Sequence, residues 1–253
     1  MQKIQKKIAA DIRQHGWHMV GVASAEGETD EGPPFAYTIG LEDTFDHPEV
    51  IVFGLNNDLD FMHYVLSEIA KRVAKGERFE HGAKKKDLLA GFTCPFARFP
   101  KTAYEEHLGQ AIVWHESPSF RAVQCIWPDP KKKLPWDPKF IPQLLDREPV
   151  FLRPDAGPRD PAWPFEQSHS HFTITSRQVA TGKQPIRYIG RFDDGSYQFV
   201  CETTDDEDDI VRTTFGWLYD RDPSVKAAAK LKPGSAIRRT KPGDAWKKGP
   251  APE

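Results

Sequence analysis

Two neighbouring stretches near the N-terminus decide the fold of this chain: FAYTIGL at residues 35–41 and HPEVIVFGL at residues 47–55. The first combines aromatic and β-branched residues in a short apolar run, which favours a strand. In the second, the apolar run Val50–Leu55 follows Pro48 and is typical of a strand buried on both faces. We therefore expect two strands here with a polar turn between them.

The segments on either side of these stretches extend the pattern. Residues 17–23 are expected to pair with residues 35–41 as an antiparallel hairpin, because the segment between them is rich in glycine, proline and acidic residues. Isoleucines at spacing four predict a short amphipathic helix over residues 4–14, which Gly16 would end. A longer helix is predicted after Asn57 or Asp58, closed by Gly76, from apolar residues at alternating steps of three and four: Leu59, Met62, Leu66, Ile69 and Val73.

The rest of the N-terminal half reads mainly as strands. Residues 79–86 are rich in glycine and lysine and predict a loop, whereas strands are expected over residues 92–99, 111–115 and 121–127. Strands then outnumber helices. This half is therefore predicted to be α+β, with a β-rich curled sheet or partial barrel and one long packed helix.

A proline-rich segment divides the chain. Ten prolines fall between Pro128 and Pro164, a composition that provides few backbone donors, and we place a linker at residues 141–168. The predicted domains are residues 1–140 and 169–248, with a disordered tail at 249–253.

The second domain is expected to be a smaller antiparallel sheet with a short helix. Strands are predicted over residues 172–179, 186–192 and 197–202, with a tight turn at Asp193–Ser196. Residues 211–219 fit a strand or a helix, and residues 223–231 begin as an alanine-rich helix. From Lys241 onward we expect disorder.

Composition restricts the function. The chain has 253 residues with 35 basic and 37 acidic side chains, so no overall positive field is available to hold nucleic acid or an acidic membrane. No apolar stretch approaches the roughly 20 residues that span a bilayer, and the N-terminus lacks the apolar core of a signal peptide. We therefore expect a cytoplasmic protein with neither nucleic acid nor membrane as its partner.

Cofactor and metal motifs are not found in the sequence. The three cysteines form no CxxC pair, and neither a GxGxxG nor a GxxxxGK[ST] pattern occurs. His169 and His171 could provide half of a metal site in an extended segment, but no third ligand is indicated and solvated histidines are the alternative. Cys94 or Cys125 lacks the setting of a nucleophile. We expect no cofactor, no metal and no catalytic residue of a recognised kind.

One candidate ligand pocket lies around the deciding stretches. His47 and Glu49 pair an imidazole with a carboxylate at the start of a predicted strand, where Tyr37 and Thr38 could complete a polar pocket. The alternative is structural: the two side chains would orient the turn through hydrogen bonds to the backbone.

A candidate recognition surface begins where the last predicted strand of the first half ends. Trp127, Asp129 and Trp136 place large aromatics and carboxylates beside rigid prolines, an arrangement that often contributes contact area at low entropy cost. The alternative is a tryptophan lid over the end of the sheet. The acidic run at residues 205–209 lacks the spacing of a calcium loop and would be a solvated loop or a docking site for a basic partner.

Several motifs in order along residues 5–140 resemble the bacterial domain-of-unknown-function family 4262. They are Gly16-Trp17, FAYTIGL at 35–41, His47-Pro48-Glu49, Gly54-Leu55, and QCIWPD at 124–129 with Pro135-Trp136. The resemblance implies no established reaction.

Residues 170–248 are similar to the immunity protein 33 family. The shared motifs are Thr175-Ser176, YIGR at 188–191, DGSYQF at 194–199, Asp208-Asp209, DPSV at 222–225, and PGSA at 233–236 with Arg238 or Arg239. Tyr197 departs from the tryptophan usual in that family, and the acidic loop is differently spaced. The resemblance implies an antidote that binds a secreted bacterial toxin, which adds Tyr197, Asp208 and Asp209 to the candidate recognition surface.

Two functional hypotheses of different classes follow. The first is a cytoplasmic binding protein with a protein partner such as a toxin. The second is a split-barrel-like flavin or small-ligand binding enzyme in the N-terminal half, with Tyr37, Thr38, His47 and Glu49 lining its pocket, an analogy of topology alone. A structural pairing of two interaction modules is a third possibility.

Overall fold

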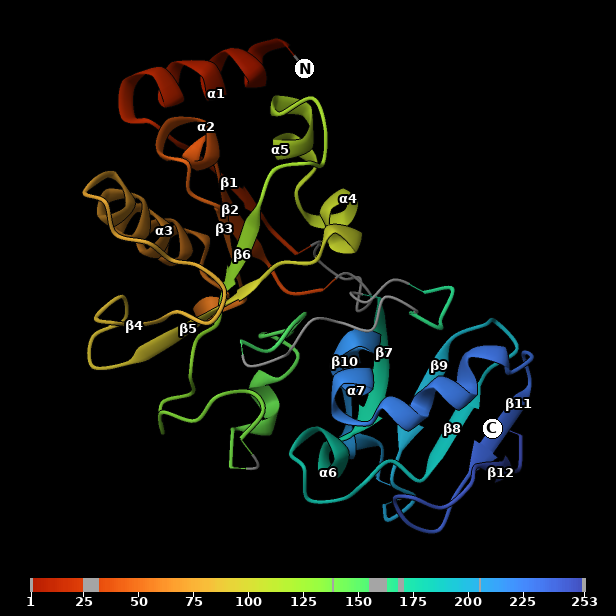
Figure 1. Ribbon diagram of the computed structural model, residues 1–253. Coiled ribbons are helices and arrows are strands. Elements are labelled where there is room, and N and C mark those ends of the chain that lie inside the picture. Colours follow the sequence, from red (N-terminus) through yellow and green to blue (C-terminus); the bar gives the residue numbers. More distant parts are fainter. Residues whose placement is uncertain are drawn as a thin grey trace. The chain divides into compact units, whose positions relative to one another are not determined.

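The computed structural model describes residues 2–24, 32–137, 139–154, 163–167, 171–204 and 206–251. The chain divides into two compact units. The N-terminal unit comprises Met1–Lys132 and Leu152–Asp155, and the C-terminal unit comprises Lys133–Phe151 and Ala156–Glu253. Each unit contains one six-stranded sheet (Figure 1).

The sheet of the N-terminal unit has the strand order β1-β2-β3-β6-β5-β4. Its strands are β1 (His18–Val22), β2 (Phe35–Ile39), β3 (Glu49–Phe53), β4 (Lys84–Lys86), β5 (Thr93–Arg98) and β6 (Ala122–Cys125). All neighbours are antiparallel except β3 and β6, which run parallel with Glu49 opposite Ala122. The predicted hairpin is confirmed, since His18 pairs with Ile39 and Val22 with Phe35. Every residue of β3 is buried, as its apolar run predicts.

Helices accompany this sheet. They are α1 (Gln2–His15), α2 (Leu41–Phe45), η1 (Leu55–Asn57), α3 (Leu59–Ala74), η2 (Lys101–Ala103), α4 (Tyr104–His107) and α5 (Gly109–Trp114). The long helix α3 packs against β1, β2 and β3 (Figure 1). Asp58 begins it by accepting the backbone N–H groups of Asp60 and Phe61 at 2.9 and 3.1 Å, which is ordinary N-capping.

Two local predictions in this unit are wrong. Residues 111–115 do not form a strand, because they belong to helix α5 and to the residue that follows it. So short a run of small, β-branched and aromatic residues fits the period of a helix as well as that of a strand, so tertiary packing determines which one forms. The expected loop at residues 79–86 contains the short strand β4, which pairs with β5.

The C-terminal unit has a sheet in the order β10-β7-β9-β8-β11-β12. Its strands are β7 (Phe172–Ser176), β8 (Tyr188–Arg191), β9 (Tyr197–Val200), β10 (Ile210–Thr214), β11 (Ser235–Arg238) and β12 (Lys247–Lys248). Its helices are η3 (Pro142–Leu144), α6 (Arg177–Ala180), η4 (Glu207–Asp209), α7 (Phe215–Arg221) and η5 (Pro223–Lys230). The sheet is mostly antiparallel, with the parallel pair β7 and β9 as the difference from the expected pattern.

The predicted tight turn between the second and third strands of this unit is present. The turn at 193–196 joins β8 to β9, with the Phe192 N–H donating to Ser196 O at 2.9 Å. Residues 211–219 take both forms that their pattern allows, since β10 is followed at once by α7. Disorder from Lys241 onward is wrong, because β12 pairs with β11. Residues 252 and 253 lie outside the described residues.

Aromatic rings fill the core of the C-terminal unit. Phe215 lies 5.1 Å from Phe165, 5.3 Å from Tyr197 and 5.4 Å from Phe199, measured between ring centroids. Within the segment predicted as a linker, Leu145, Val150, Phe151 and Phe165 are buried. The described part of that segment therefore contributes apolar side chains to packing, despite its prolines.

The fold class predicted from the sequence is confirmed: the protein is α+β. In the described residues neither six-stranded sheet closes into a barrel. No helix of the described chain has the length and apolar character to cross a membrane.

Candidate functional site

The first candidate site surrounds the side chain of Glu49, which is completely buried at the start of β3. Thr38 Oγ1 donates to Glu49 Oε2 at 2.7 Å and accepts the Val50 N–H at 2.9 Å. A buried carboxylate is costly unless it is hydrogen-bonded, and these contacts lower that cost.

The backbone around Gly40 gives Glu49 three more donors. The N–H groups of Gly40, Leu41 and Glu42 point at the carboxylate over 2.7, 3.3 and 3.3 Å. Gly40 adopts a φ of 103°, and a Cβ at this position would lie 2.8 Å from the Ile12 side chain. Glycine is thus required both for the turn and for the close approach of α1. The carboxylate of Glu49 occupies the start of α2 and satisfies its unpaired donors.

His115 joins this network from the residue after α5. Its Nε2 lies 3.3 Å from Glu49 Oε1, and its Nδ1 lies 3.5 Å from Asp43 Oδ1. Burial disfavours the charged imidazolium, but the hydrogen bond to Glu49 and the negative charges of Glu49, Asp43 and Glu42 together raise the pKa of His115. When His115 is protonated, its imidazolium balances the charge of the buried carboxylate.

His47 belongs to a different set of contacts. It is fully buried, its Nδ1 lies 2.7 Å from Pro48 O, and its Nε2 accepts the Phe79 N–H at 2.9 Å. Since Nε2 must be an acceptor, the ring is neutral and carries its proton on Nδ1. Burial, the largest cause, lowers the pKa of His47. This histidine ties the turn before β3 to the segment after α3.

Tyr37 is also enclosed. Its hydroxyl oxygen accepts the Gln110 N–H at 3.3 Å, and burial raises its pKa to about 12. The four residues of the candidate ligand pocket, Tyr37, Thr38, His47 and Glu49, are each buried, with exposed fractions of 2% or less. Each is hydrogen-bonded to the protein's own backbone or side chains, as expected if these residues orient the turn and do not bind a ligand. A ligand would have to break these bonds to reach their polar atoms.

The candidate recognition surface is divided between buried and accessible residues. Trp127 is 5% exposed and donates its indole N–H to Phe53 O at 2.7 Å, while Asp129 is fully buried. Tyr197 is 4% exposed and lies in the aromatic core of the C-terminal unit. These three side chains offer almost no contact area. Trp136 is half-buried.

The acidic turn is accessible and held in place. Asp208 is exposed, and Asp209 is partly exposed. The carboxylate of Asp209 accepts from Arg177 Nε at 3.2 Å, Gln178 Nε2 at 2.6 Å and Thr204 Oγ1 at 2.8 Å. These hydrogen bonds lower the pKa of Asp209. Asp205 lies outside the described residues.

No cluster of metal ligands is assembled in the described chain. His169 lies outside the described residues, so its pairing with His171 is not described. Within residues 2–24, 32–137, 139–154, 163–167, 171–204 and 206–251 no group of three or more histidine, cysteine, aspartate or glutamate side chains is arranged to hold a metal ion. Cys94, Cys125 and Cys201 are buried, and none of them is joined in a disulfide.

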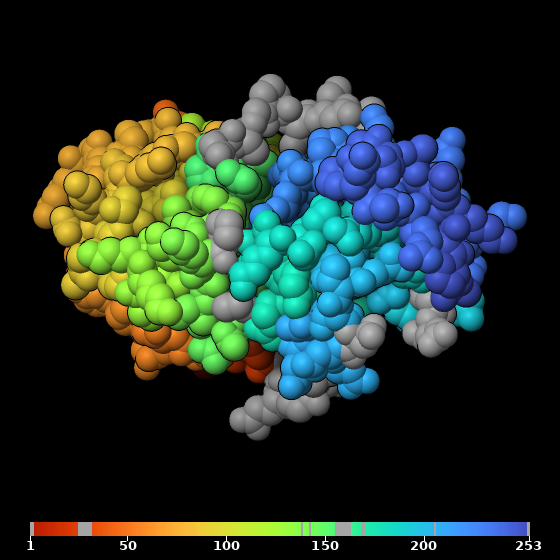
Figure 2. All heavy atoms as spheres, turned by 90° about the horizontal axis from the view of Figure 1, so that it is seen from below, coloured from red at the N-terminus to blue at the C-terminus, as the bar shows by residue number. Residues whose placement is uncertain are grey.

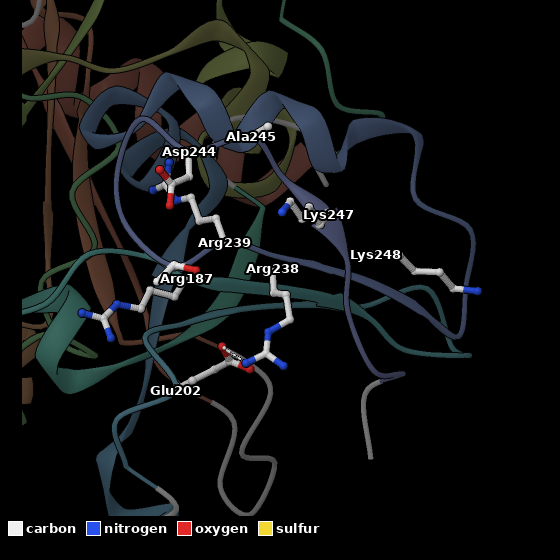
Figure 3. Close-up of a pocket in the computed structure, with 9 residues that line it drawn as sticks. Arg187, Glu202, Arg238, Arg239, Asp244, Ala245, Lys247 and Lys248 are labelled. Carbon is white, nitrogen blue, oxygen red and sulfur yellow. Dashed lines mark hydrogen bonds and ion pairs between the residues drawn. The ribbon is translucent and has the colours of Figure 1, made fainter.

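A second candidate site is an open cavity of about 880 Å³ in the C-terminal unit, which we call the basic cavity. Its lining residues flank β8 and β9 or lie from the end of β11 through β12: Arg187, Glu202, Arg238, Arg239, Thr240, Asp244, Ala245, Lys247 and Lys248. In Figure 3, Arg238 points toward Glu202, with Nη2 3.3 Å from Glu202 Oε2. The final strands, dark blue in Figure 2, lie at the surface of this unit.

The back of the basic cavity is fixed by Arg239. This side chain is 6% exposed, and its guanidinium donates to Ile186 O at 3.0 Å, to Ser224 Oγ at 2.8 Å and to Asp222. The same guanidinium lies 4.4 Å from the ring centroid of Trp246. Arg239 is therefore a structural residue that holds the chain carrying Lys247 and Lys248.

This cavity was not predicted from the sequence, although a signal for it was present. Between positions 221 and 251 there are nine lysine and arginine residues but only two acidic ones, a local excess that the overall charge conceals. Counting charge by segment would have indicated a basic surface.

Comparison with known proteins gives the family of the first half. The chain belongs to the family described as a domain of unknown function (DUF4262), whose model matches residues 11–141. This confirms the resemblance of the N-terminal half, and nothing in the comparison supports the resemblance of residues 170–248. No curated protein matches the chain. No solved structure matches it either.

Proposed function

We propose that the chain is a binding protein that recognises another protein through its C-terminal unit. The observation that carries this proposal is the basic cavity, which is large, open and lined mainly by charged side chains on a fixed wall. Charged groups held in place before binding favour specific recognition, because less ordering is required on association.

The candidate polar residues of the N-terminal unit also favour a binding protein over an enzyme, because they are enclosed. These residues, Tyr37, Thr38, His47 and Glu49, are buried and engaged with one another or with backbone groups. A general acid or base must reach the proton that it transfers. In this geometry those groups stabilise the turn and the start of β3.

The partner that we favour is a secreted bacterial toxin, neutralised in the cytoplasm. This choice rests on sequence motifs alone, such as YIGR at 188–191 and DGSYQF at 194–199, which resemble those of the immunity protein 33 family. Asp208 and Asp209 add a fixed acidic turn to the same unit. A surface with separate acidic and basic groups suits a protein partner better than a uniformly charged polymer.

Native mass spectrometry of the protein purified untreated from its own host tests the proposal. We expect a stoichiometric protein partner under conditions in which the host produces its toxins. A matched sample in high salt should lose part of the partner, since contacts between exposed charges are screened. Recovery of the chain alone under all these conditions, or with a bound small molecule in place of a protein, would contradict the proposal.

A further inference from the structure

The basic cavity has an excess of positive charge that the protein neutralises only in part. Among the described residues that line it, five side chains are cationic and two, Glu202 and Asp244, are acidic. Arg238 pairs with Glu202 and Arg239 pairs with Asp222 from outside the lining, so the remaining positive charge is that of Arg187, Lys247 and Lys248. Arg187 Nε is buried and has no hydrogen-bond partner among the residues that the structure describes. Lys247 and Lys248 are exposed.

The composition of the lining selects the class of ligand. Ala245 is the one apolar residue in the part of the lining that the structure describes, whereas sites for small organic molecules are lined mostly by apolar and aromatic groups. The described residues of the lining include no aromatic ring on which a nucleotide base could stack. An anion bound by charge and hydrogen bonding is the chemistry that remains.

The arrangement of the cations indicates an extended anion. In Figure 3 the side chains of Arg187 and Lys248 extend in opposite directions, and Arg238 is directed toward Glu202. A single phosphate would need these cations to converge on one point. Charges spread over a cavity of about 880 Å³ fit several separate negative groups on one chain.

The two acidic residues in the lining decide between polyanions. Glu202 pairs with Arg238, and the Asp244 carboxylate accepts the Lys241 N–H at 3.2 Å. A continuous polyphosphate would meet repulsion at these points, whereas an acidic peptide can place its carboxylates away from them.

We infer that the basic cavity binds an acidic segment of a protein partner, whose carboxylates pair with Arg238, Lys247 and Lys248. The inference rests on the proposed function in one respect, namely that the partner is a protein. It adds the site and the chemistry of the segment that is recognised. Arginine and lysine together give both directional and adaptable contacts to carboxylates.

Fluorescence anisotropy with a defined probe tests this inference on the full chain. The probe is a fluorescein-labelled ten-residue peptide of alternating glutamate and serine, and its counterpart has glutamine in place of glutamate. We expect saturable binding of the glutamate peptide that weakens as salt increases, and at least tenfold weaker binding of the glutamine peptide.

Two double variants separate the cavity from the general charge of the unit. Lys247→Glu with Lys248→Glu should weaken binding at least tenfold. Lys226→Glu with Lys230→Glu makes the same charge change at exposed positions of η5 that do not line the cavity, and should leave binding within about twofold. Urea unfolding of each variant checks that the fold is retained, and Arg238→Ala provides a third cavity variant that introduces no negative charge.

Several outcomes would overturn the inference. They are no binding of the glutamate peptide, equal losses in the two double variants, or displacement of the peptide by inorganic phosphate or a single-stranded oligonucleotide at lower concentration than by unlabelled peptide. If a protein partner co-purifies and binds equally well to the variant with Lys247→Glu and Lys248→Glu, the assignment of the cavity fails while the proposed function stands. If the peptide binds as expected but no protein partner is recovered, the proposed function fails instead.

Discussion

Thr38 and Glu49 are joined by a buried hydrogen bond of 2.7 Å between hydroxyl and carboxylate. The same hydroxyl accepts the Val50 N–H, so one side chain of β2 holds both the side chain and the backbone at the start of β3. This arrangement makes Glu49 a structural centre of the N-terminal unit.

Glu49→Gln should therefore destabilise the protein strongly. The amide would turn an NH₂ group toward backbone donors that now face an oxygen, and we expect a loss of about 3–5 kcal/mol in the free energy of unfolding, as for other broken buried charge contacts. Thr38→Val should cost about 1–3 kcal/mol, because it leaves buried partners unbonded. Urea unfolding measures both values. Glu105→Gln, at an exposed position of α4, is the control and should change stability by less than about 0.5 kcal/mol.

His107 should limit stability in acid. Its ring lies 5.2 Å from Phe35 and Phe53, and burial lowers its pKa to about 4. Because the folded pKa lies below that of the unfolded chain, about 6.5, the contribution of neutral His107 is complete above about pH 6.5. It is lost as the pH falls toward 4, and amounts to roughly 3 kcal/mol at most.

His107→Phe tests this expectation because phenylalanine keeps an aromatic ring in the cluster but cannot be protonated. The variant should lose less stability than the original protein between pH 7 and pH 4 in urea unfolding. Part of the acid dependence should remain, because the pKa values of His47 and His171 are also lowered by burial. His15→Gln, at an exposed position, should leave the dependence unchanged. If His107→Phe lost as much stability between pH 7 and pH 4 as the original protein, His107 would not be a cause of the acid dependence.

His115 should behave in the opposite sense. Its folded pKa is raised, so the contribution of the imidazolium to stability is complete below about pH 6.5 and is lost as the pH rises through the folded pKa. An NMR titration of the imidazole should give a midpoint above about 6.5. His115→Gln should cost about 1–3 kcal/mol at pH 6 and less at higher pH. A midpoint below that of a free histidine would show that the negative charges around His115 do not control its titration.

The enzyme hypothesis makes a distinct prediction. If the N-terminal unit were a flavin binder with Tyr37, Thr38, His47 and Glu49 in its pocket, the purified protein would show flavin absorbance or quench the fluorescence of added flavin. We expect neither, because these groups are buried and already bonded within the protein. The enzyme hypothesis would be supported if the protein bound flavin stoichiometrically and Thr38→Val lost this binding while it retained the fold.

Much of the N-terminal unit could be predicted because its signals are local. Helix α3 follows from apolar spacing and from Asp58 as its cap, and β3 follows from one continuous apolar run. Helix α5 was not predictable in this way, because Ala111–Trp114 is too short for its period to be decisive. Here tertiary surroundings determine the structure.

The roles of the candidate residues depended on information that is not local. His47 and Glu49 are two residues apart, yet one bonds to Phe79 and the other to Thr38 and the start of α2. The basic cavity likewise forms only because β8, β11 and β12 are neighbours, which brings Arg187 close to residues after position 237. Contacts between residues that are far apart in the sequence leave no periodic pattern from which they could be predicted.

The parallel pairing of β3 with β6 also determines when the first sheet can be completed. Glu49 lies opposite Ala122, so a nascent chain must extend past residue 125 before the middle of this sheet closes. Until then β3, whose residues are all buried in the finished unit, presents an open edge of apolar residues. Fragments that end before Ala122 should consequently aggregate on expression. Fragments that include all of β6 should not aggregate through this edge.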